Sequence, residues 1–195
     1  MSMTESDTSL RDRLVDAGVE LLAAEGLQAL TLREIARRTG VSHGAPRRYF
    51  PTHLELLSAI ARRGFADLAE RTRRALDRET GGARARVAAL AGAYLEFALE
   101  QPGMYELMFR HDLLESGRLG LRETSLPLFS LLTGLIAAAD PGADAPRVAG
   151  ALWANLHGLA QLWRWRSLQL ATGEQDLAAL LETVLVAHLG PGGGR

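Results

Sequence analysis

The sequence predicts an all-α protein, made of a small three-helix domain at the N-terminus and a larger helical domain after it. Apolar residues recur at intervals of three and four along most of the 195 residues, which is the spacing of one face of a helix. Two capping boxes, in which a threonine precedes a glutamate by three residues, begin helices after Thr31 and after Thr52. Glycine and proline separate the helical stretches. We expect the domain boundary near Thr52, which gives domains of residues 1–52 and 53–195.

Composition limits the classes of protein to which the chain can belong. It is 47% hydrophobic and 23% charged with a formal net charge of −1, a balance that is typical of soluble proteins. The lack of cysteine excludes disulfides, thiolate catalysis and thiolate zinc sites. The N-terminus does not resemble a signal peptide, and no apolar run reaches the roughly 20 residues that a membrane helix needs. We therefore expect a cytoplasmic protein that does not enter a membrane.

The first helix is expected to begin after an N-cap at Ser9 and to run to about Ala24. Glu25 and Gly26 end it. Its apolar residues follow helical spacing at Leu10, Leu14, Val15, Ala17, Gly18, Leu21 and Leu22.

Residues 31–50 carry the pattern of a helix, a turn and a second helix. The capping box at Thr31 begins the first of these, and Gly40 supplies the left-handed residue that ends it. Ser42 is then the N-cap of a short helix over residues 43–49, and Phe50 turns inward to close a small core. Within this segment five arginines face one acid, Glu34; they are Arg33, Arg37, Arg38, Arg47 and Arg48. This local positive charge favours contact with nucleic acid, although the whole chain is almost neutral.

The short second helix suits a groove of DNA. Gly44 and Ala45 let the backbone approach closely, and their polar neighbours can hydrogen-bond to base edges and phosphates. These neighbours are Ser42, His43, Arg47, Arg48 and Tyr49. We interpret Arg37 and Arg38 as a solvated helix surface rather than as DNA contacts.

The segment GLQALTLREIARRTGVSHGAPRRYFPTHLELL resembles the N-terminal DNA-binding segment of the TetR family of bacterial transcriptional regulators. The resemblance covers about residues 10–60, with the helices, the turn and the caps in the same order. It implies phosphate contacts at Thr31 and Arg33. It also implies base or phosphate contacts from Ser42, His43, Gly44, Arg47 and Tyr49.

Three positions depart from the commonest pattern of that family, which has tyrosine at Arg47, histidine at Tyr49 and lysine at His53. Arg47 can read a guanine with a bidentate fork or bind a phosphate, and the sequence leaves both roles open. A neutral His53 is a weaker phosphate partner than lysine, so DNA affinity is expected to depend more on Arg47 and Arg48.

The capping box at Thr52 begins a long helix that is expected to run toward Arg78, with its arginines on a solvated face beside acids. Another helix is expected over residues 87–99. Residues 104–109 then place five large apolar side chains in six positions, which must be covered nearly all round or line a cavity.

Three more helices are expected over residues 119–139, 147–170 and 174–189, the first interrupted by Pro127. The last two have too many apolar positions for one buried face, which is typical of helices that meet a partner. LWANLHGLAQLW, with Trp153, His157 and Gly158, and PGMYELMF resemble the C-terminal domain of a TetR subgroup named for a Trp, a His and a Gly. This likeness implies a homodimer joined by the last two helices and a small-molecule cavity between the middle ones.

The candidate effector-binding residues are large and mostly apolar, which favours a hydrophobic or aromatic effector. They are Tyr94, Phe97, Tyr105, Met108, Phe129, Trp153 and His157. Packing in the core is the ordinary role of such residues, and His157 is equally a core histidine or a ligand contact. Arg110 and His111 either bind a ligand carboxylate or lie on the surface.

No phosphate loop, nucleophile elbow or metal-ligand spacing of histidines occurs in the sequence. We therefore expect no catalytic residues, no metal and no cofactor, and the chain is not expected to be an enzyme. The family resemblance implies a repressor that binds a palindromic operator as a homodimer and is relieved by a small effector, although the sequence would also allow activation. Two alternatives remain: a helical small-molecule carrier or sensor with a non-functional DNA-binding head, and a helical enzyme.

Overall fold

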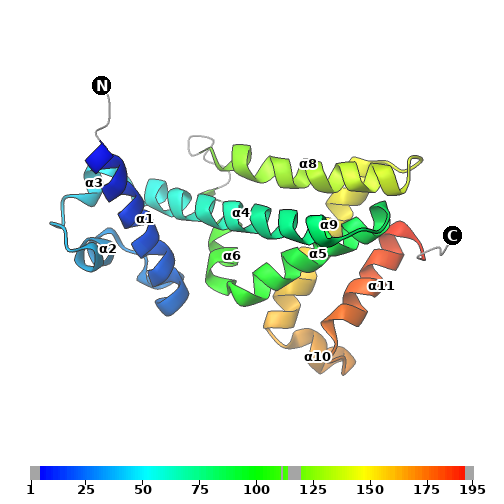
Figure 1. The fold of residues 1–195 in the computed structure, drawn as a ribbon. Coiled ribbons are helices and arrows are strands. Elements are labelled where there is room, and N and C mark those ends of the chain that lie inside the picture. Colours follow the sequence, from blue (N-terminus) through cyan, green and yellow to red (C-terminus); the bar gives the residue numbers. More distant parts are fainter. Residues whose placement is uncertain (1–4, 111, 114–119, 192–195) are drawn as a thin grey trace. The chain divides into compact units, whose positions relative to one another are not determined.

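The structure is a computed structural model that describes residues 5–110, 112–113 and 120–191. These residues form helices joined by short loops, and no strand occurs among them, so the predicted all-α class is confirmed (Figure 1). The chain divides into two compact units. Unit 1 comprises residues 1–67 and 101–124, and unit 2 comprises residues 68–100 and 125–195. The two compact units divide after Asp67. The boundary near Thr52 between a DNA-binding and an effector-binding domain stays a prediction.

Unit 1 contains the helix-turn-helix and the helices that support it. Its elements are α1 (Glu5–Glu25), a 3-10 turn (Leu27–Ala29), α2 (Leu32–Thr39), α3 (Pro46–Tyr49), the first part of α4 (His53–Arg78) and α6 (Pro102–Met108). Helix α1 packs against both α2 and α3, as the blue and cyan segments of Figure 1 show.

The first helix begins earlier than the sequence suggested. We expected an N-cap at Ser9, but α1 already starts at Glu5. The predicted end is correct, because α1 ends at Glu25 and Gly26 follows with a positive φ of 81°.

The two threonine caps are built differently. At Thr52 the capping box is complete: the Thr52 N–H donates to Glu55 Oε2 and the Glu55 N–H donates to Thr52 Oγ1, each at 3.2 Å. At Thr31 only half of it forms, because Oγ1 accepts from the Glu34 N–H at 3.1 Å while the Glu34 carboxylate turns toward two arginines. The predicted reciprocal box is therefore wrong at Thr31 and confirmed at Thr52.

Helix α3 is shorter than the expected helix over residues 43–49. The first backbone bond of that helix would run from residue 46 to the Ser42 carbonyl, and Pro46 has no N–H to donate. The Ala45 N–H donates to this carbonyl instead, at 2.9 Å, and makes a turn. The regular helix therefore begins at Pro46, and Ser42 is not its N-cap.

The core of unit 1 is closed by the apolar segment around α6. Tyr105, Leu107 and Met108 are fully buried. The sequence predicted that this segment is either covered nearly all round or lines a cavity, and the burial agrees with the first of these. Phe109 meets the rings of Phe65 and Tyr105 edge to face, with centroids 5.9 Å and 5.0 Å away. Further core residues of this unit include Leu14, Leu21, Ile35, Phe50, Leu56 and Ile60.

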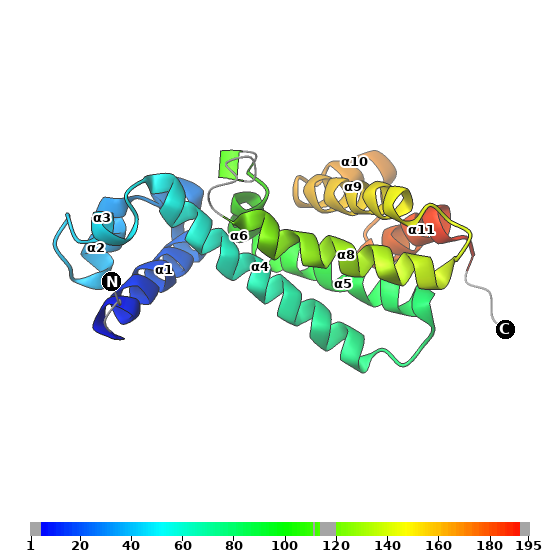
Figure 2. The same cartoon turned by 90° about the horizontal axis from the view of Figure 1, so that it is seen from above.

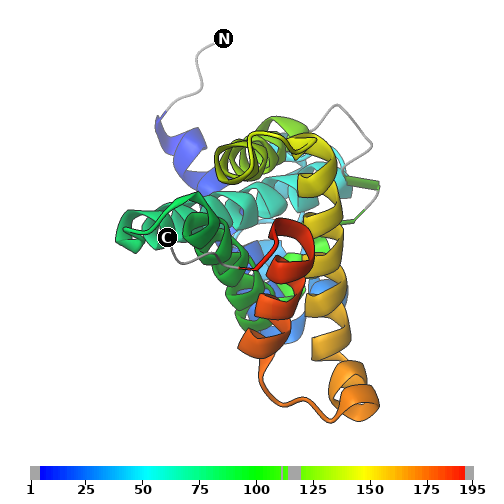
Figure 3. The same ribbon diagram turned by 90° about the vertical axis from the view of Figure 1, so that its right-hand side faces the viewer.

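Unit 2 is a helical bundle. Its elements are the rest of α4, α5 (Ala83–Glu100), most of α8 (Leu121–Ala139), α9 (Ala145–Arg164), α10 (Ser167–Thr172) and α11 (Leu177–Leu189). Helix α5 packs against α9 and α11, and α10 lies against α9 (Figure 2). Helices α9 and α11 lie side by side, as the yellow-orange and red segments of Figure 3 show.

Several predicted boundaries in this unit were wrong. Helix α5 begins at Ala83 rather than at Val87. The helix expected over residues 147–170 is two helices, broken where Arg166 adopts a positive φ of 62°. The Trp163 carbonyl at the break accepts from the Arg166 N–H at 3.0 Å and from the buried side-chain amide of Gln169 at 3.3 Å.

The last helix and α8 also differ in detail. Helix α11 begins at Leu177 instead of near Glu174, because Asp176 caps it by accepting from the Ala178 N–H at 2.8 Å. Helix α8 is described from Leu121, and residue 119 of the expected helix lies outside the described residues. Pro127 lies inside α8 without ending it.

Candidate nucleic-acid interface and effector site

The residues expected to contact DNA lie at the solvent-exposed side of the helix-turn-helix. Thr31 caps α2, so its hydroxyl and the first N–H groups of that helix share one end. Gly40, at φ 69°, turns the chain toward α3, and Phe50 is buried beneath it. Tyr49 is half-buried, whereas the other candidates are exposed: Thr31, Arg33, Ser42, His43, Gly44, Arg47, Arg48 and His53.

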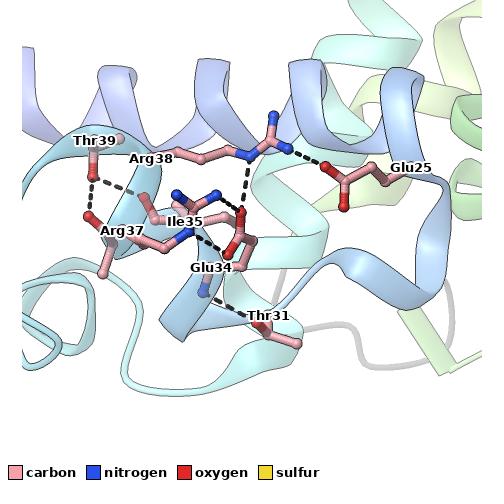
Figure 4. A network of polar contacts seen from close by, with 8 residues as sticks. Glu25, Thr31, Glu34, Ile35, Arg37, Arg38 and Thr39 are labelled. Carbon is pink, nitrogen blue, oxygen red and sulfur yellow. Dashed lines mark hydrogen bonds and ion pairs between the residues drawn. The ribbon is translucent and has the colours of Figure 1, made fainter.

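The arginines of this segment fall into two classes, of which the first is paired. The Glu34 carboxylate accepts from Arg37 at 2.8 and 2.6 Å and from Arg38 at 3.1 Å, and Arg38 also bonds to Glu25 (Figure 4). The hydrogen bonds from Arg37 and Arg38 lower the pKa of Glu34 to about 2, so this acid stays ionised at neutral pH. This pairing supports the interpretation of Arg37 and Arg38 as helix surface.

The second class is Arg33, Arg47 and Arg48. Within the part of the chain that the structure describes, none of these three has an acidic side chain within ion-pair distance. Their guanidinium groups are exposed and keep their donors free for an anion. The helix-turn-helix therefore presents an unneutralised positive surface from α2 and α3.

His53 has a contact that the sequence did not suggest. It is the first residue of α4 and lies between Thr52 and Glu55, the two members of the capping box. Its ring Nε2 is 2.6 Å from the carbonyl oxygen of Leu30. Leu30 is buried and directly precedes the Thr31 cap. His53 thus joins the start of α4 to the turn before α2.

Two arginines of α1 contact the helix-turn-helix, and the sequence analysis did not predict these contacts. Arg13 donates to the Thr39 carbonyl at the end of α2, at 3.1 Å, and Arg11 lies over the ring of Phe50 at 5.2 Å from its centroid. A sequence contains no signal for such contacts between distant residues.

Four of the candidate effector-binding residues lie together in unit 2. The Tyr94 hydroxyl on α5 is 3.0 Å from His157 Nδ1 on α9. The rings of Trp153 and His157 are 6.5 Å apart, and Phe129 on α8 meets Trp153 edge to face at 6.2 Å. This effector cluster runs from the buried Tyr94 to Trp153, which is 40% exposed.

Within the effector cluster, the protonation state of His157 depends on its surroundings. Burial lowers the pKa of His157 below its ordinary value of 6.5, which favours the neutral ring. A neutral imidazole paired with a phenol can exchange hydrogen bonds with a ligand without adding charge to the site.

The other three candidates lie elsewhere. Phe97 belongs to unit 2 but is fully buried beneath the Arg71 guanidinium, 5.6 Å from its ring centroid. Tyr105 and Met108 are buried in unit 1 and form its core. Arg110 pairs with Asp112 at 2.6 Å on the surface, and His111 lies outside the described residues.

No group of three or more histidine or acidic side chains among the described residues is arranged to hold a metal ion. No helix in the same residues is both long and apolar enough to cross a membrane.

Two family models match the chain. The model described as "Bacterial regulatory proteins, tetR family" matches residues 14–60, from α1 to the start of α4. The model described as "Tetracyclin repressor-like, C-terminal domain" matches residues 87–188, which are more than half of the chain. The narrower likeness to the Trp-His-Gly subgroup stays a prediction.

Individual proteins are similar as well. The solved structure of a protein of unknown function from Rhodococcus sp. RHA1 has a TM-score of 0.79 and 30% identity, over 92% of this chain and 95% of that one. The nucleoid occlusion factor SlmA of Haemophilus ducreyi is 31% identical over 114 residues, 57% of this chain and 56% of that protein. The HTH-type transcriptional activator FasR of Mycolicibacterium smegmatis is 33% identical over 102 residues, 52% of this chain and 46% of that protein. The chain spans about half the length of these two curated relatives.

Proposed function

Because the chain belongs to the TetR family of bacterial regulatory proteins, we propose that it regulates transcription in the cytoplasm by binding an operator as a homodimer. The observation that carries this proposal is the sorting of the arginines. Arg37 and Arg38 are paired with Glu34 and Glu25, two acids for two arginines. Arg33, Arg47 and Arg48 are exposed without an acidic partner in the described residues. A surface that only needed solubility would not require this separation, whereas a DNA surface requires free cations at the groove.

The homodimer is proposed through α9 and α11. Helix α11 has the sequence LAALLETVLVAHL, in which Glu182 is the one acid, yet Leu185 is its one buried residue. Trp153 and Leu162 of α9 and Val186 of α11 are exposed to between 39% and 40%. A helix that is apolar on nearly all sides is normally buried, so a second copy of the chain would cover this surface.

A palindromic operator follows from the two-fold symmetry of such a dimer. Two recognition helices would enter successive major grooves about 34–36 Å apart. Each subunit would bind one half-site with Arg33 at a phosphate and with Ser42, His43 and Arg47 near the base edges. Gly44 leaves room for this approach, because a Cβ built there meets no atom within 4 Å.

The effector cluster, Tyr94, Phe129, Trp153 and His157, is the proposed site for a small hydrophobic effector. Its rings supply apolar contact, and the Tyr94–His157 pair supplies a hydrogen-bonding end. Helix α4 runs without interruption from His53 in unit 1 to Arg78 in unit 2, so it is the natural carrier of a signal to DNA. A coupling of about 1–3 kcal/mol between the two binding events would suffice.

We propose repression that the effector relieves, on the basis of the family resemblance. One similar protein is named a transcriptional activator, so activation is the alternative sign. In both cases the chain acts by binding and not by catalysis.

The test is a titration of the full-length protein against duplexes from a random-sequence pool, followed by sequencing of the retained DNA. Enrichment of an inverted repeat, with affinity that falls steeply as salt rises, is the expected result. Tight binding of small aromatic molecules without any enriched DNA would instead identify a carrier with an inactive DNA-binding head.

A further inference from the structure

The position of His53 raises a question about its role, because the residue at this place was expected to touch a DNA phosphate. Its Nε2 is already 2.6 Å from the Leu30 carbonyl oxygen. A carbonyl oxygen can only accept a hydrogen bond, so the proton of the neutral ring must be on Nε2. Nδ1 of the neutral ring is then an acceptor, and it has no hydrogen to offer a phosphate.

The hydrogen bond connects two parts of the DNA-binding unit that are far apart in sequence. Leu30 is 1% exposed and lies one residue before Thr31, whose side chain caps α2. His53 is fixed in turn by the capping box of Thr52 and Glu55 at the start of α4. A shift of the first turn of α4 would therefore pull directly on the N-terminal end of α2, where Thr31 and Arg33 face solvent.

We propose that His53 is a positioning residue for DNA binding, which acts through Leu30 to hold the N-terminal end of α2 in place and does not itself bind a phosphate. The proposal rests on the proposed DNA-binding function. It assigns the phosphate contacts at this end of the helix-turn-helix to Thr31 and Arg33. It also makes the hydrogen bond between His53 and Leu30 the connection through which helix α4 positions the N-terminal end of α2.

The dependence of affinity on salt separates this role from a phosphate contact. A lost contact between a cationic side chain and a phosphate makes the plot of log affinity against log salt less steep by about 0.9, whereas a lost positioning bond lowers affinity at every salt concentration with the same steepness. The probe is a duplex selected from a random pool by the wild-type protein. Anisotropy titrations are run on every variant at the same fixed pH.

Three substitutions give the comparison. His53→Ala is expected to weaken binding about fivefold to tenfold, as for the loss of one hydrogen bond, with an unchanged slope. His53→Gln should restore most of the affinity, because its amide N–H can occupy the place of Nε2–H. Arg33→Gln is the matched control, and it should lower the slope.

The possible results are decisive in both directions. A lower slope in His53→Ala, rescue by His53→Lys but not by His53→Gln, or no loss of affinity would each overturn the positioning role. Thermal unfolding of each variant identifies a folding defect, and the His53→Gln result stands if His53→Ala unfolds. If the wild-type protein enriches no DNA at all, the proposed function fails, and that outcome is distinct from the failure of this inference.

Discussion

The hydroxyl of Tyr94 lies 3.0 Å from Nδ1 of His157, and this bond joins α5 to α9 inside unit 2. Tyr94 is 6% exposed and His157 is half-buried, so the pair forms the inner end of the effector cluster. Burial lowers the pKa of His157, and the neutral ring is the form that the fold favours.

This shift predicts how stability changes with pH. The pKa of His157 is 6.5 in the unfolded chain and lower in the native state, so below pH 6.5 the unfolded state binds more protons. The free energy of unfolding should therefore fall as pH drops from 6.5 toward the native pKa of His157. His157→Gln should remove this part of the loss, which urea titrations at several pH values would measure. An identical pH profile in the variant would contradict the assignment.

Substitution of Glu34 should release Arg37, whose acidic partner it is. Glu34→Gln keeps the Thr31 cap, because Thr31 Oγ1 accepts from the backbone N–H of residue 34 and not from its side chain. Arg37 would then be free to meet a phosphate, whereas Arg38 keeps its bond to Glu25. We expect tighter non-specific binding to DNA and a salt slope that is steeper by up to about 0.9 for one new phosphate contact. An unchanged slope would mean that Arg37 lies beyond reach of the DNA backbone.

Arg47 can be assigned to a base or a phosphate by the pattern of its loss. If it reads guanine, Arg47→Ala should cost about 1–3 kcal/mol and relax the preference at one position of the operator. If it binds a phosphate, affinity should fall equally for all sequences, together with the salt slope. Binding to a set of single-base operator variants distinguishes the two, and Arg37→Ala is the control whose guanidinium is already paired.

The local sequence patterns predicted the helices well, because helix caps and helical periodicity depend on residues that are close together in the sequence. The Thr31 N-cap, the left-handed Gly40 and the Thr52–Glu55 box are found as expected, and only the return bond from Glu34 to Thr31 is missing. Several boundaries were nevertheless wrong. Pro46 delays the start of α3, and Arg166, with a positive φ of 62°, breaks the helix expected over residues 147–170, which helical periodicity does not reveal.

The same limit applies to the sites. The exposure of the residues proposed to contact DNA could be predicted from the sequence, since Arg47 and Ser42 belong to one short polar segment. The effector cluster could not, because Tyr94 and His157 are 63 residues apart and aromatic composition does not distinguish them from Tyr105. Tyr105 is instead a core residue of unit 1, fully buried against Phe109.

Two glycines offer a matched test of packing. A Cβ at Gly18 of α1 would lie 3.0 Å from Ile60 Cγ1 and closer still to its terminal methyl, whereas a Cβ at Gly92 of α5 meets nothing within 4 Å. Gly18→Ala should therefore destabilise the protein by about 1–3 kcal/mol through overpacking. Gly92→Ala should stabilise it by about 0.5–1 kcal/mol, because alanine is the better helix former. Chemical denaturation measures both, and a neutral Gly18→Ala would show that Ile60 can move aside.

The surface formed by α9 and α11 provides the test of the dimer. Val186 is 39% exposed on α11, where Leu185 is the one buried residue. If a second copy covers this surface, Val186→Asp places an unpaired charge in the interface, and burial of such a charge strongly disfavours association. Sedimentation should then show a monomer or a much weaker dimer with unchanged helix content.

Leu126→Asp on α8 is the control for that experiment, because Leu126 is 57% exposed but lies outside α9 and α11. It adds the same charge to the same unit and should leave the dimer intact. DNA affinity should follow the oligomeric state, since a monomer reaches only one half-site of a two-fold operator. A Val186→Asp protein that remains dimeric would place the subunit interface elsewhere. Dissociation by Leu126→Asp would show that α8 belongs to the interface.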